Sequence, residues 1–204
     1  MGTTAYTTKD IQELRQRTGA GMMDCKAALE EASGDKEKAI EILRKKGVAR
    51  TEKRAGREVK EGLVQSYIHH NAKLGVLVEV NCETDFVARN EDFRNLVKAI
   101  AEHIAAGVPA PAVAVTREQV PADLVERERR IFTEQAVESG KPQNIVDKMV
   151  QGRVDKYYKE VVLLDQPWVR DDSKTIGDLV KEVSAKTGEN IVVRRFARFA
   201  IGQD

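Results

Sequence analysis

Side chains that could carry out a reaction are few in this sequence, and they do not form a recognisable catalytic set. His69 and His70 are neighbours at the end of a predicted strand, where consecutive side chains point to opposite faces, so the pair is not expected to share a metal ion or a proton. Cys25 and Cys82 lie far apart, without Cys or His at metal-ligand spacing, and are expected to be buried thiols. The sequence offers no phosphate-binding glycine loop, nucleophile–histidine pair or paired carboxylates at persuasive spacing. It therefore favours a binding protein, and a hydrolase that uses Asp85 with His69 or His70 is the weaker alternative.

The segment Thr84-Asp85-Phe86-Val87 places a large apolar ring beside a carboxylate, in the connection between a predicted strand and a predicted helix. Such connections lie at the surface of a protein. In one interpretation Phe86 fills the core beneath the connection, and Asp85 or Thr84 caps the local turn. In the other, Phe86 is a projecting anchor that enters a pocket on another protein. The residues alone leave both interpretations open.

The stretch 44–60 is strongly basic, with eight Lys or Arg residues against two Glu. The whole chain is nearly neutral, with 34 Lys and Arg against 33 Asp and Glu, so no general attraction to nucleic acid or to an anionic membrane is expected. The stretch also lacks aromatic residues for base stacking, which favours a solvated surface that meets an acidic protein partner. An RNA-binding module that uses this stretch together with Arg194, Arg195 and Arg198 is the alternative.

Residues 1–48 are predicted to form a module of three short helices. Thr8 is suited to cap the first helix, which stops near Gly19. A third helix is expected to follow the capping residue Asp35 and to end before Gly47. An isolated core of about 40 residues is only marginally stable. We therefore expect this module to dock onto another molecule.

The chain after a basic linker at 49–60 is predicted to be an α+β core over residues 61–204. Alternating residues over 63–69 and 74–82 predict a β-hairpin. Apolar residues at helical spacing from Phe93 to Ile104 predict a helix, on which His103 is expected at the surface or in an interface.

The second half of this core is expected to hold an antiparallel helix pair, at 122–139 and 142–165. A short helix over 175–186 precedes alternating residues at 190–202, which are expected to return to the hairpin as the third strand of a small antiparallel sheet. The apolar residues expected on one side of this strand are Ile191, Val193, Ala197, Phe199 and Ile201.

No apolar run in the sequence approaches the roughly 20 residues that cross a bilayer. The first residues also lack the pattern of a secretion signal or of an organellar presequence. The chain is therefore expected to be cytoplasmic and to have no membrane partner.

Two long motifs resemble the family of bacterial translation elongation factor Ts, which is the guanine nucleotide exchange factor for elongation factor Tu. The first is Leu14-Arg15-Gln16-Arg17-Thr18-Gly19-Ala20-Gly21-Met22-Met23-Asp24-Cys25-Lys26-Ala27-Ala28-Leu29, and the second is Val78-Glu79-Val80-Asn81-Cys82-Glu83-Thr84-Asp85-Phe86-Val87-Ala88-Arg89-Asn90. Gly140-Lys141-Pro142 and Arg194-Arg195-Phe196 also fit this family. The resemblance implies a ubiquitin-associated-like helical module followed by an α+β core. It also implies a protein that has no cofactor or metal of its own and that makes no direct contact with nucleic acid.

The resemblance gives the projecting role to Phe86, with Asp85 as its polar partner, near the Mg²⁺ site of elongation factor Tu. It leaves Thr84 and Val87 to fix the geometry of the connection. Weaker candidates for partner contact are Arg15, Met22 and Met23 in the N-terminal module. Longer relatives carry a second core half, whereas this sequence has no internal repeat, so a homodimer is expected, with the final strand as a plausible interface.

Overall fold

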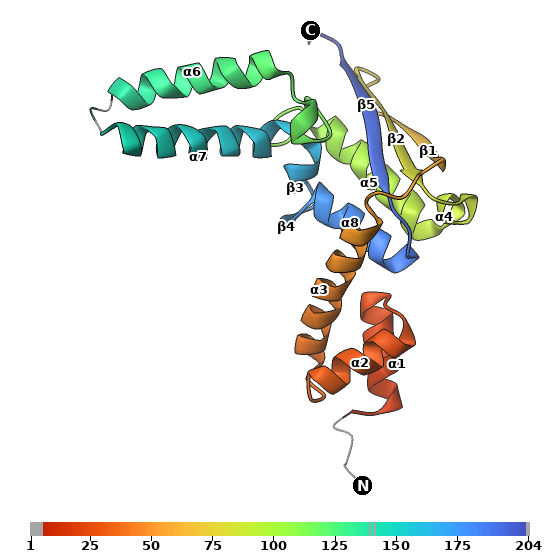
Figure 1. The fold of residues 1–204 in the computed structure, drawn as a ribbon. Coiled ribbons are helices and arrows are strands. Elements are labelled where there is room, and N and C mark those ends of the chain that lie inside the picture. Colours follow the sequence, from red (N-terminus) through yellow and green to blue (C-terminus); the bar gives the residue numbers. More distant parts are fainter. Residues whose placement is uncertain (1–5, 139, 141, 203–204) are drawn as a thin grey trace. The chain divides into compact units, whose positions relative to one another are not determined.

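The computed structural model describes residues 6–138, 140 and 142–202 (Figure 1). The chain divides into two compact units. The first unit takes the chain through Gly62 together with Asn81–Phe93 and Val180–Val192, and the second takes Leu63–Val80, Arg94–Leu179 and the chain from Val193 onward. The α+β class predicted from the sequence is confirmed, with three N-terminal helices followed by a three-stranded antiparallel sheet and further helices.

The three N-terminal helices are α1 (Thr8–Thr18), α2 (Met22–Glu31) and α3 (Lys36–Arg54). Helix α1 is capped by Thr7, one residue before the expected Thr8, in a reciprocal pair with Asp10: each residue's backbone N–H donates to the other's side chain. Asp10 also binds Lys36, and these hydrogen bonds hold the pKa of its carboxyl well below the usual range. The buried residues of this bundle are Leu14, Cys25, Ala28, Leu29, Ala32, Ala39 and Leu43.

Helix α3 is longer than the sequence predicts, because it continues through Gly47 to Arg54. Glycine inside a helix costs about 1 kcal/mol relative to alanine, and for that reason the sequence favoured an end there. A Cβ atom at Gly47 would lie 3.3 Å from the Cβ of Ala185, so the missing side chain leaves room for a close packing partner. The first residues of the expected linker, up to Arg54, are therefore helical.

The sheet has the order β1-β2-β5, from β1 (Glu61–Ile68), β2 (Leu74–Cys82) and β5 (Val192–Ala200), so β2 is the central strand. This confirms the predicted hairpin and the returning third strand. The predicted inner face of β2 is also confirmed, because Val76, Val78, Val80 and Cys82 are all buried. Between β2 and the long helix α5 (Glu91–Ala106) lies a single short helix, α4 (Asp85–Arg89).

The apolar residues over 190–202 that were expected on one side of the final strand are divided in the structure. Ile191 and Val193 are buried, whereas Phe199 and Ile201 are 69% and 77% exposed. Arg194 and Arg195 are two consecutive exposed residues, so they interrupt the alternation on which the prediction depended.

Helices α6 (Ala122–Glu138) and α7 (Gln143–Val161) form the predicted antiparallel pair and lie side by side in Figure 1. Their shared core contains Ala136, Val146, Val150 and Val154. Ser139 and Lys141, in the predicted turn between the two helices, lie outside the described residues. The chain then passes through a 3₁₀ turn at Leu163–Asp165 and a two-stranded antiparallel sheet that the sequence did not predict, made of β3 (Pro167–Trp168) and β4 (Asp171–Thr175). Helix α8 (Ile176–Thr187) leads to β5.

His103 is fully buried in α5, which contradicts its expected place at the surface or in an interface. The backbone N–H of Val169 donates to its Nδ1 at 3.3 Å, so the proton is on Nε2, which donates to Oε1 of Gln166 at 3.0 Å. The Gln166 amide in turn donates to two backbone carbonyls, those of Ala110 and Glu160. A polar side chain can be buried when its hydrogen-bonding atoms all have partners. Both ring nitrogens of His103 have such partners. The helical spacing could have indicated that His103 is buried, because residue 103 lies three positions after the core residue Ile100.

Candidate partner-binding site

The short helix α4 presents Phe86 to solvent. Thr84 is its N-cap, and the Thr84 hydroxyl accepts a hydrogen bond from the backbone N–H of Val87 at 3.4 Å. Val87 and Ala88 are buried, whereas the Phe86 ring is 79% exposed. The core beneath the connection is therefore filled by Val87 and Ala88. The interpretation of Phe86 as a core residue is wrong.

Asp85 stands at the first position of the same turn, next to the exposed ring. Its carboxylate is 45% exposed and forms an ion pair with the guanidinium of Arg89 at 2.7 Å, one helical turn further on. Exposed pairs of this kind contribute little stability, about 0.3–0.5 kcal/mol in a helix. The ion pair therefore orients the carboxylate without tying it firmly.

A carboxylate from a distant part of the sequence holds the backbone that leads into this turn. Glu189 accepts hydrogen bonds from the backbone N–H groups of Glu83 and Thr84, each at 3.0 Å, and from the Thr84 hydroxyl at 2.6 Å. Glu189 is not among the site residues predicted from the sequence. No local pattern points to it, because the three bonds join segments that are more than 100 residues apart.

Both cysteines are buried, as predicted, and neither has the properties of a nucleophile. The Cys82 thiol donates to the backbone carbonyl of Thr84, and burial, with a smaller contribution from the negative charge of Glu189, raises its pKa to about 11. Burial also raises the pKa of the Cys25 thiol. Because the thiolate is the reactive form, both side chains are inert near neutral pH.

The candidate contacts of the N-terminal helices are accessible. Met22 and Met23 begin α2 and are 50% and 75% exposed, and Arg15 on α1 is exposed as well. Thus neither methionine belongs to the buried core. These residues and the α4 turn both belong to the first compact unit.

His69 and His70 lie closer together than the sequence suggested. Their ring centroids are 4.2 Å apart, and Nδ1 of His69 is 3.0 Å from the Tyr67 hydroxyl. The expectation of opposite faces is wrong because β1 ends at Ile68, so strand alternation no longer applies to the pair. In the part of the chain that the structure describes, no three His, Cys, Asp or Glu side chains gather in a way that could hold a metal ion.

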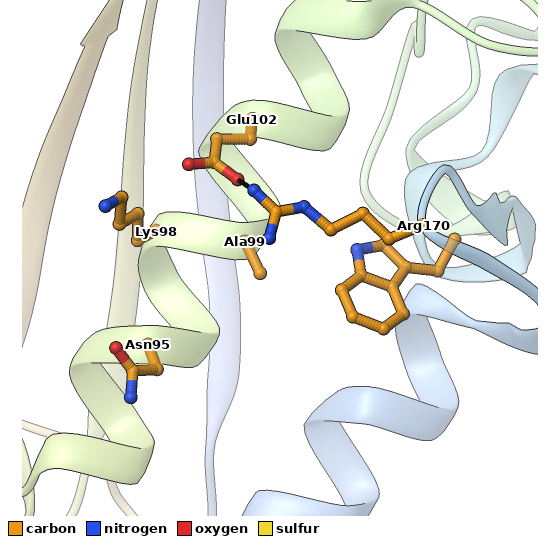
Figure 2. Close-up of a pocket in the computed structure, with 6 residues that line it drawn as sticks. Asn95, Lys98, Ala99, Glu102 and Arg170 are labelled. Atoms are coloured by element: carbon orange, nitrogen blue, oxygen red, sulfur yellow. Dashed lines mark hydrogen bonds and ion pairs between the residues drawn. The ribbon is translucent and has the colours of Figure 1, made fainter.

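The second unit contains an open pocket of about 280 Å³ (Figure 2). Arg170 reaches from the β3–β4 turn to the carboxylate of Glu102 on α5, and the two form an ion pair. The other lining residues are Asn95, Lys98, Ala99 and Trp168. With one carboxylate, already paired, and no histidine or cysteine, this lining supplies neither a general acid–base pair nor a set of metal ligands.

One face of the three-stranded sheet exposes several large apolar side chains to solvent. Leu77 is 49% exposed and shares this face with Glu79, two residues further along β2, whose carboxylate binds Arg195 of β5 at 2.7 Å. Phe199 and Ile201 follow Arg195 at the same period of two. On β1, Ile68 contacts the position where Gly75 lacks a side chain, which places Ile68 on the same face. We call this surface the outer sheet face; its apolar residues are Val64, Ile68, Leu77, Phe199 and Ile201.

None of the described helices is long and apolar enough to span a membrane.

Comparison with known proteins identifies the family. The family model for elongation factor Ts matches residues 5–203. The chain is 56% identical over 193 residues to elongation factor Ts of Fervidobacterium nodosum, with 95% of this chain and 96% of the relative covered. It is also 56% identical to the factor of Desulforamulus reducens, covering 95% and 88%, and 55% identical to that of Geobacter metallireducens, covering 98% and 91%. A match of this extent shows the family: the chain belongs to the elongation factor Ts family.

Proposed function

We propose that this chain is a guanine nucleotide exchange factor that binds elongation factor Tu in its GDP-bound form and accelerates the release of GDP. The observation that carries the proposal is the exposure of Phe86 on a turn whose neighbouring residues, Val87 and Ala88, are buried. A large aromatic ring held in water by a well-anchored turn is suited to enter a pocket on another protein. Asp85 supplies a carboxylate beside it.

The exchange works by a change of geometry on the partner and makes or breaks no covalent bond. GDP bound to such a GTPase depends on Mg²⁺, which demands a nearly octahedral shell of oxygen ligands. A ring inserted beside this shell shifts the elements that hold it, and a displacement of about one ångström weakens a site of such strict geometry. In this mechanism the Mg²⁺ belongs to the partner's nucleotide site.

The energetic requirement is modest. The factor must bind the nucleotide-free partner more tightly than the GDP form, and GDP must weaken the factor by the same ratio. A 100-fold ratio corresponds to about 2.7 kcal/mol, which one buried aromatic anchor with a few polar contacts supplies.

Docking is assigned to residues 1–48, with Arg15, Met22 and Met23 as contacts. The exposed methionines present flexible apolar side chains that adapt to a partner surface. Lys45, Lys46 and Lys53 belong to the basic stretch 44–60 and are exposed, so this stretch is suited to meet an acidic surface of the partner. The segment 49–60 then links the docking module to the α+β core.

The test is the release of a fluorescent GDP analogue from purified elongation factor Tu. Phe86→Ala should slow the accelerated release by about tenfold or more, and Asp85→Asn by about threefold, because the ring carries most of the anchor's contact area. Val137→Ala, which shortens another exposed apolar side chain, should have no effect. Both site variants should remain folded, since neither side chain is buried. Full acceleration by both would exclude the α4 turn from the mechanism.

A homodimer is the second part of the proposal. The outer sheet face exposes five large apolar side chains to water on one surface. Monomeric proteins rarely expose so many apolar side chains together, because contact of apolar surface with water is unfavourable. A second copy related by a twofold axis matches such a face to itself, and the Glu79–Arg195 ion pair lies on the same face. Two copies would together carry the two core halves that longer relatives have in one chain.

A further inference from the structure

The turn that presents Phe86 is fixed by the carboxylate of Glu189. One oxygen, Oε2, accepts from two consecutive backbone N–H groups, those of Glu83 and Thr84, at 3.0 Å each. The other, Oε1, accepts from the Thr84 hydroxyl at 2.6 Å. Hydrogen bonds to an ionised acceptor are stronger than neutral ones, so the three together define the direction in which the chain enters α4.

The Thr84 hydroxyl connects Glu189 to the first turn of α4. It donates its proton to Glu189, which leaves its oxygen to accept from the N–H of Val87. The Thr84 carbonyl is also used, because it accepts from the Cys82 thiol at 3.2 Å. Every hydrogen-bonding group of Thr84 is therefore engaged, and without Glu189 its hydroxyl would be free to rotate away from the cap.

Glu189 is itself held in place. Gly188 ends α8 with a positive φ of 77°, which turns the chain so that Glu189 faces the turn before α4. The backbone carbonyl of Glu189 accepts from the Ser184 hydroxyl, and the next residue, Asn190, donates its backbone N–H to the Glu83 carboxylate at 2.6 Å. Glu83 and Glu189 thus each accept backbone hydrogen bonds from the other's segment.

The same group of hydrogen bonds extends to the residues that follow α3. The side-chain amide of Asn190 donates to the backbone carbonyls of Arg57, at 2.9 Å, and Ala55. The guanidinium of Arg57 binds the Glu83 carboxylate at 3.4 Å. The position of the α4 turn is therefore tied to the segment that follows the N-terminal helices, all within the first compact unit.

We infer that Glu189 is a positioning residue for nucleotide exchange, one that holds Phe86 and Asp85 in the conformation that fits the partner. The inference rests on the proposed exchange function. A turn that is already in its binding conformation does not have to be ordered when the complex forms. When only a fraction of the molecules has this conformation, the apparent dissociation constant rises by the inverse of that fraction. Loss of Glu189 should therefore raise the concentration of factor needed and leave the maximal rate nearly unchanged, whereas loss of the Phe86 ring removes the anchor itself and should both raise that concentration and lower the maximal rate.

The test measures release of the fluorescent GDP analogue against factor concentration. Glu189→Ala should raise the half-saturating concentration about tenfold and change the maximal rate by less than about twofold, as expected when about a tenth of the turns are correctly placed. In a Phe86→Ala background the same substitution should change the half-saturating concentration by less than about twofold, because it acts through the ring. The control Glu134→Ala removes an exposed carboxylate of α6 and should leave both quantities unchanged. A full tenfold effect in the Phe86→Ala background would overturn the inference.

Amide hydrogen exchange of the isolated factor separates this inference from the proposed function. Glu189→Ala should speed exchange at the amides of Glu83, Thr84 and Val87 at least about tenfold and leave the amides of α1 unaffected. Unchanged protection at these three amides would overturn the role of Glu189, whatever the partner assay gives. If protection is lost and yet the natural chain does not accelerate release of the GDP analogue, the proposed function fails and the structural role of Glu189 stands.

Glu189→Gln covers the case in which the alanine variant does not fold. Its amide oxygen keeps the two backbone hydrogen bonds but loses the charge, so the half-saturating concentration should rise about threefold. The rise should again disappear in the Phe86→Ala background. An unchanged half-saturating concentration with unchanged amide protection would contradict the inference.

Discussion

Phe86 and Val87 are neighbours with opposite tasks, and the capped turn of α4 separates them. Val87 is 9% exposed and contributes to the fold, whereas the Phe86 ring is 79% exposed and contributes little to it. Substitution of Phe86 should therefore change binding without changing the free energy of unfolding. This separation makes the ring a clean target for testing the proposed function.

His103 is the residue whose titration should be visible in the stability of the chain. Burial lowers its pKa from the usual 6.5, so the unfolded state binds this proton more readily than the folded state. The free energy of unfolding should consequently fall as the pH drops below about 6.5, by at most about 1.4 kcal/mol per pH unit from this residue. Above that pH the residue is neutral in both states and adds no slope. Urea unfolding between pH 5.5 and 7.5, followed by the fluorescence of the single tryptophan, Trp168, measures this.

The control for this pH dependence is His103→Gln, which removes the titrating group and keeps a neutral polar side chain. The variant should be less stable at pH 7.5, because it does not reproduce both histidine hydrogen bonds. Its stability should also fall less steeply with pH than that of the natural chain. Equal slopes in the two proteins would show that His103 remains able to take up a proton in the folded state.

At the scale of residues, burial could be predicted from the sequence where it follows from the periodicity of a strand or a helix. Val76, Val78 and Val80 alternate along a strand, and their burial could be read directly. The orientation of Phe86 could not, because a five-residue helix has no repeating pattern to show which side is buried. Glu189 could not be found either, since a charged residue in a turn gives no signal until the segment that it binds is in place.

At the scale of helices, two glycines test how closely the elements pack, because one lies against the backbone of another segment and the other lies in open space. A Cβ atom at Gly177 in α8 would lie 2.9 Å from the backbone carbonyl oxygen of Leu164, whereas one at Gly152 in α7 would meet nothing within 4 Å. Gly177→Ala should therefore destabilise the chain by about 1–3 kcal/mol, despite the better helix propensity of alanine. Gly152→Ala should stabilise it by about 0.5–1 kcal/mol. Urea unfolding of both variants checks the pair, and stabilisation by Gly177→Ala would contradict the close approach of α8 to Leu164.

Element types and order were predictable because they depend on local patterns and capping residues, as for α5, where Asn90 caps the first turn. Lengths were less predictable where packing outweighs propensity. Gly47 is such a case, because its role in α3 depends on Ala185 of another helix. The β3–β4 pair was also missed, since two and five residues are too few to show alternation.

At the scale of the whole chain, each compact unit is assembled from separate stretches of sequence. The first unit combines the N-terminal helices with Asn81–Phe93 and Val180–Val192, so these helices and the α4 turn lie in one unit. This arrangement depends on contacts such as that of Asn190 with Arg57, which join residues more than 130 positions apart. A linear pattern does not reveal such contacts. The α+β class was nevertheless predictable, because it needs only the type and order of the elements.

At the scale of the whole molecule, the proposed homodimer can be tested through the outer sheet face, because that face is the expected interface. If two copies cover this face, the 22.7 kDa chain should elute as a species of twice that mass at micromolar concentration, by size-exclusion chromatography with light scattering. Leu77→Glu places a charge on the central strand of the face and should give the monomer, because burying that charge against a second copy is costly. Val137→Glu, on the exposed side of α6, should remain dimeric. Since dimerisation stabilises the folded state by mass action, the melting temperature of the natural chain should rise with its concentration, and that of Leu77→Glu should not. A monomer mass for the natural chain would show that a second copy does not cover this face at that concentration.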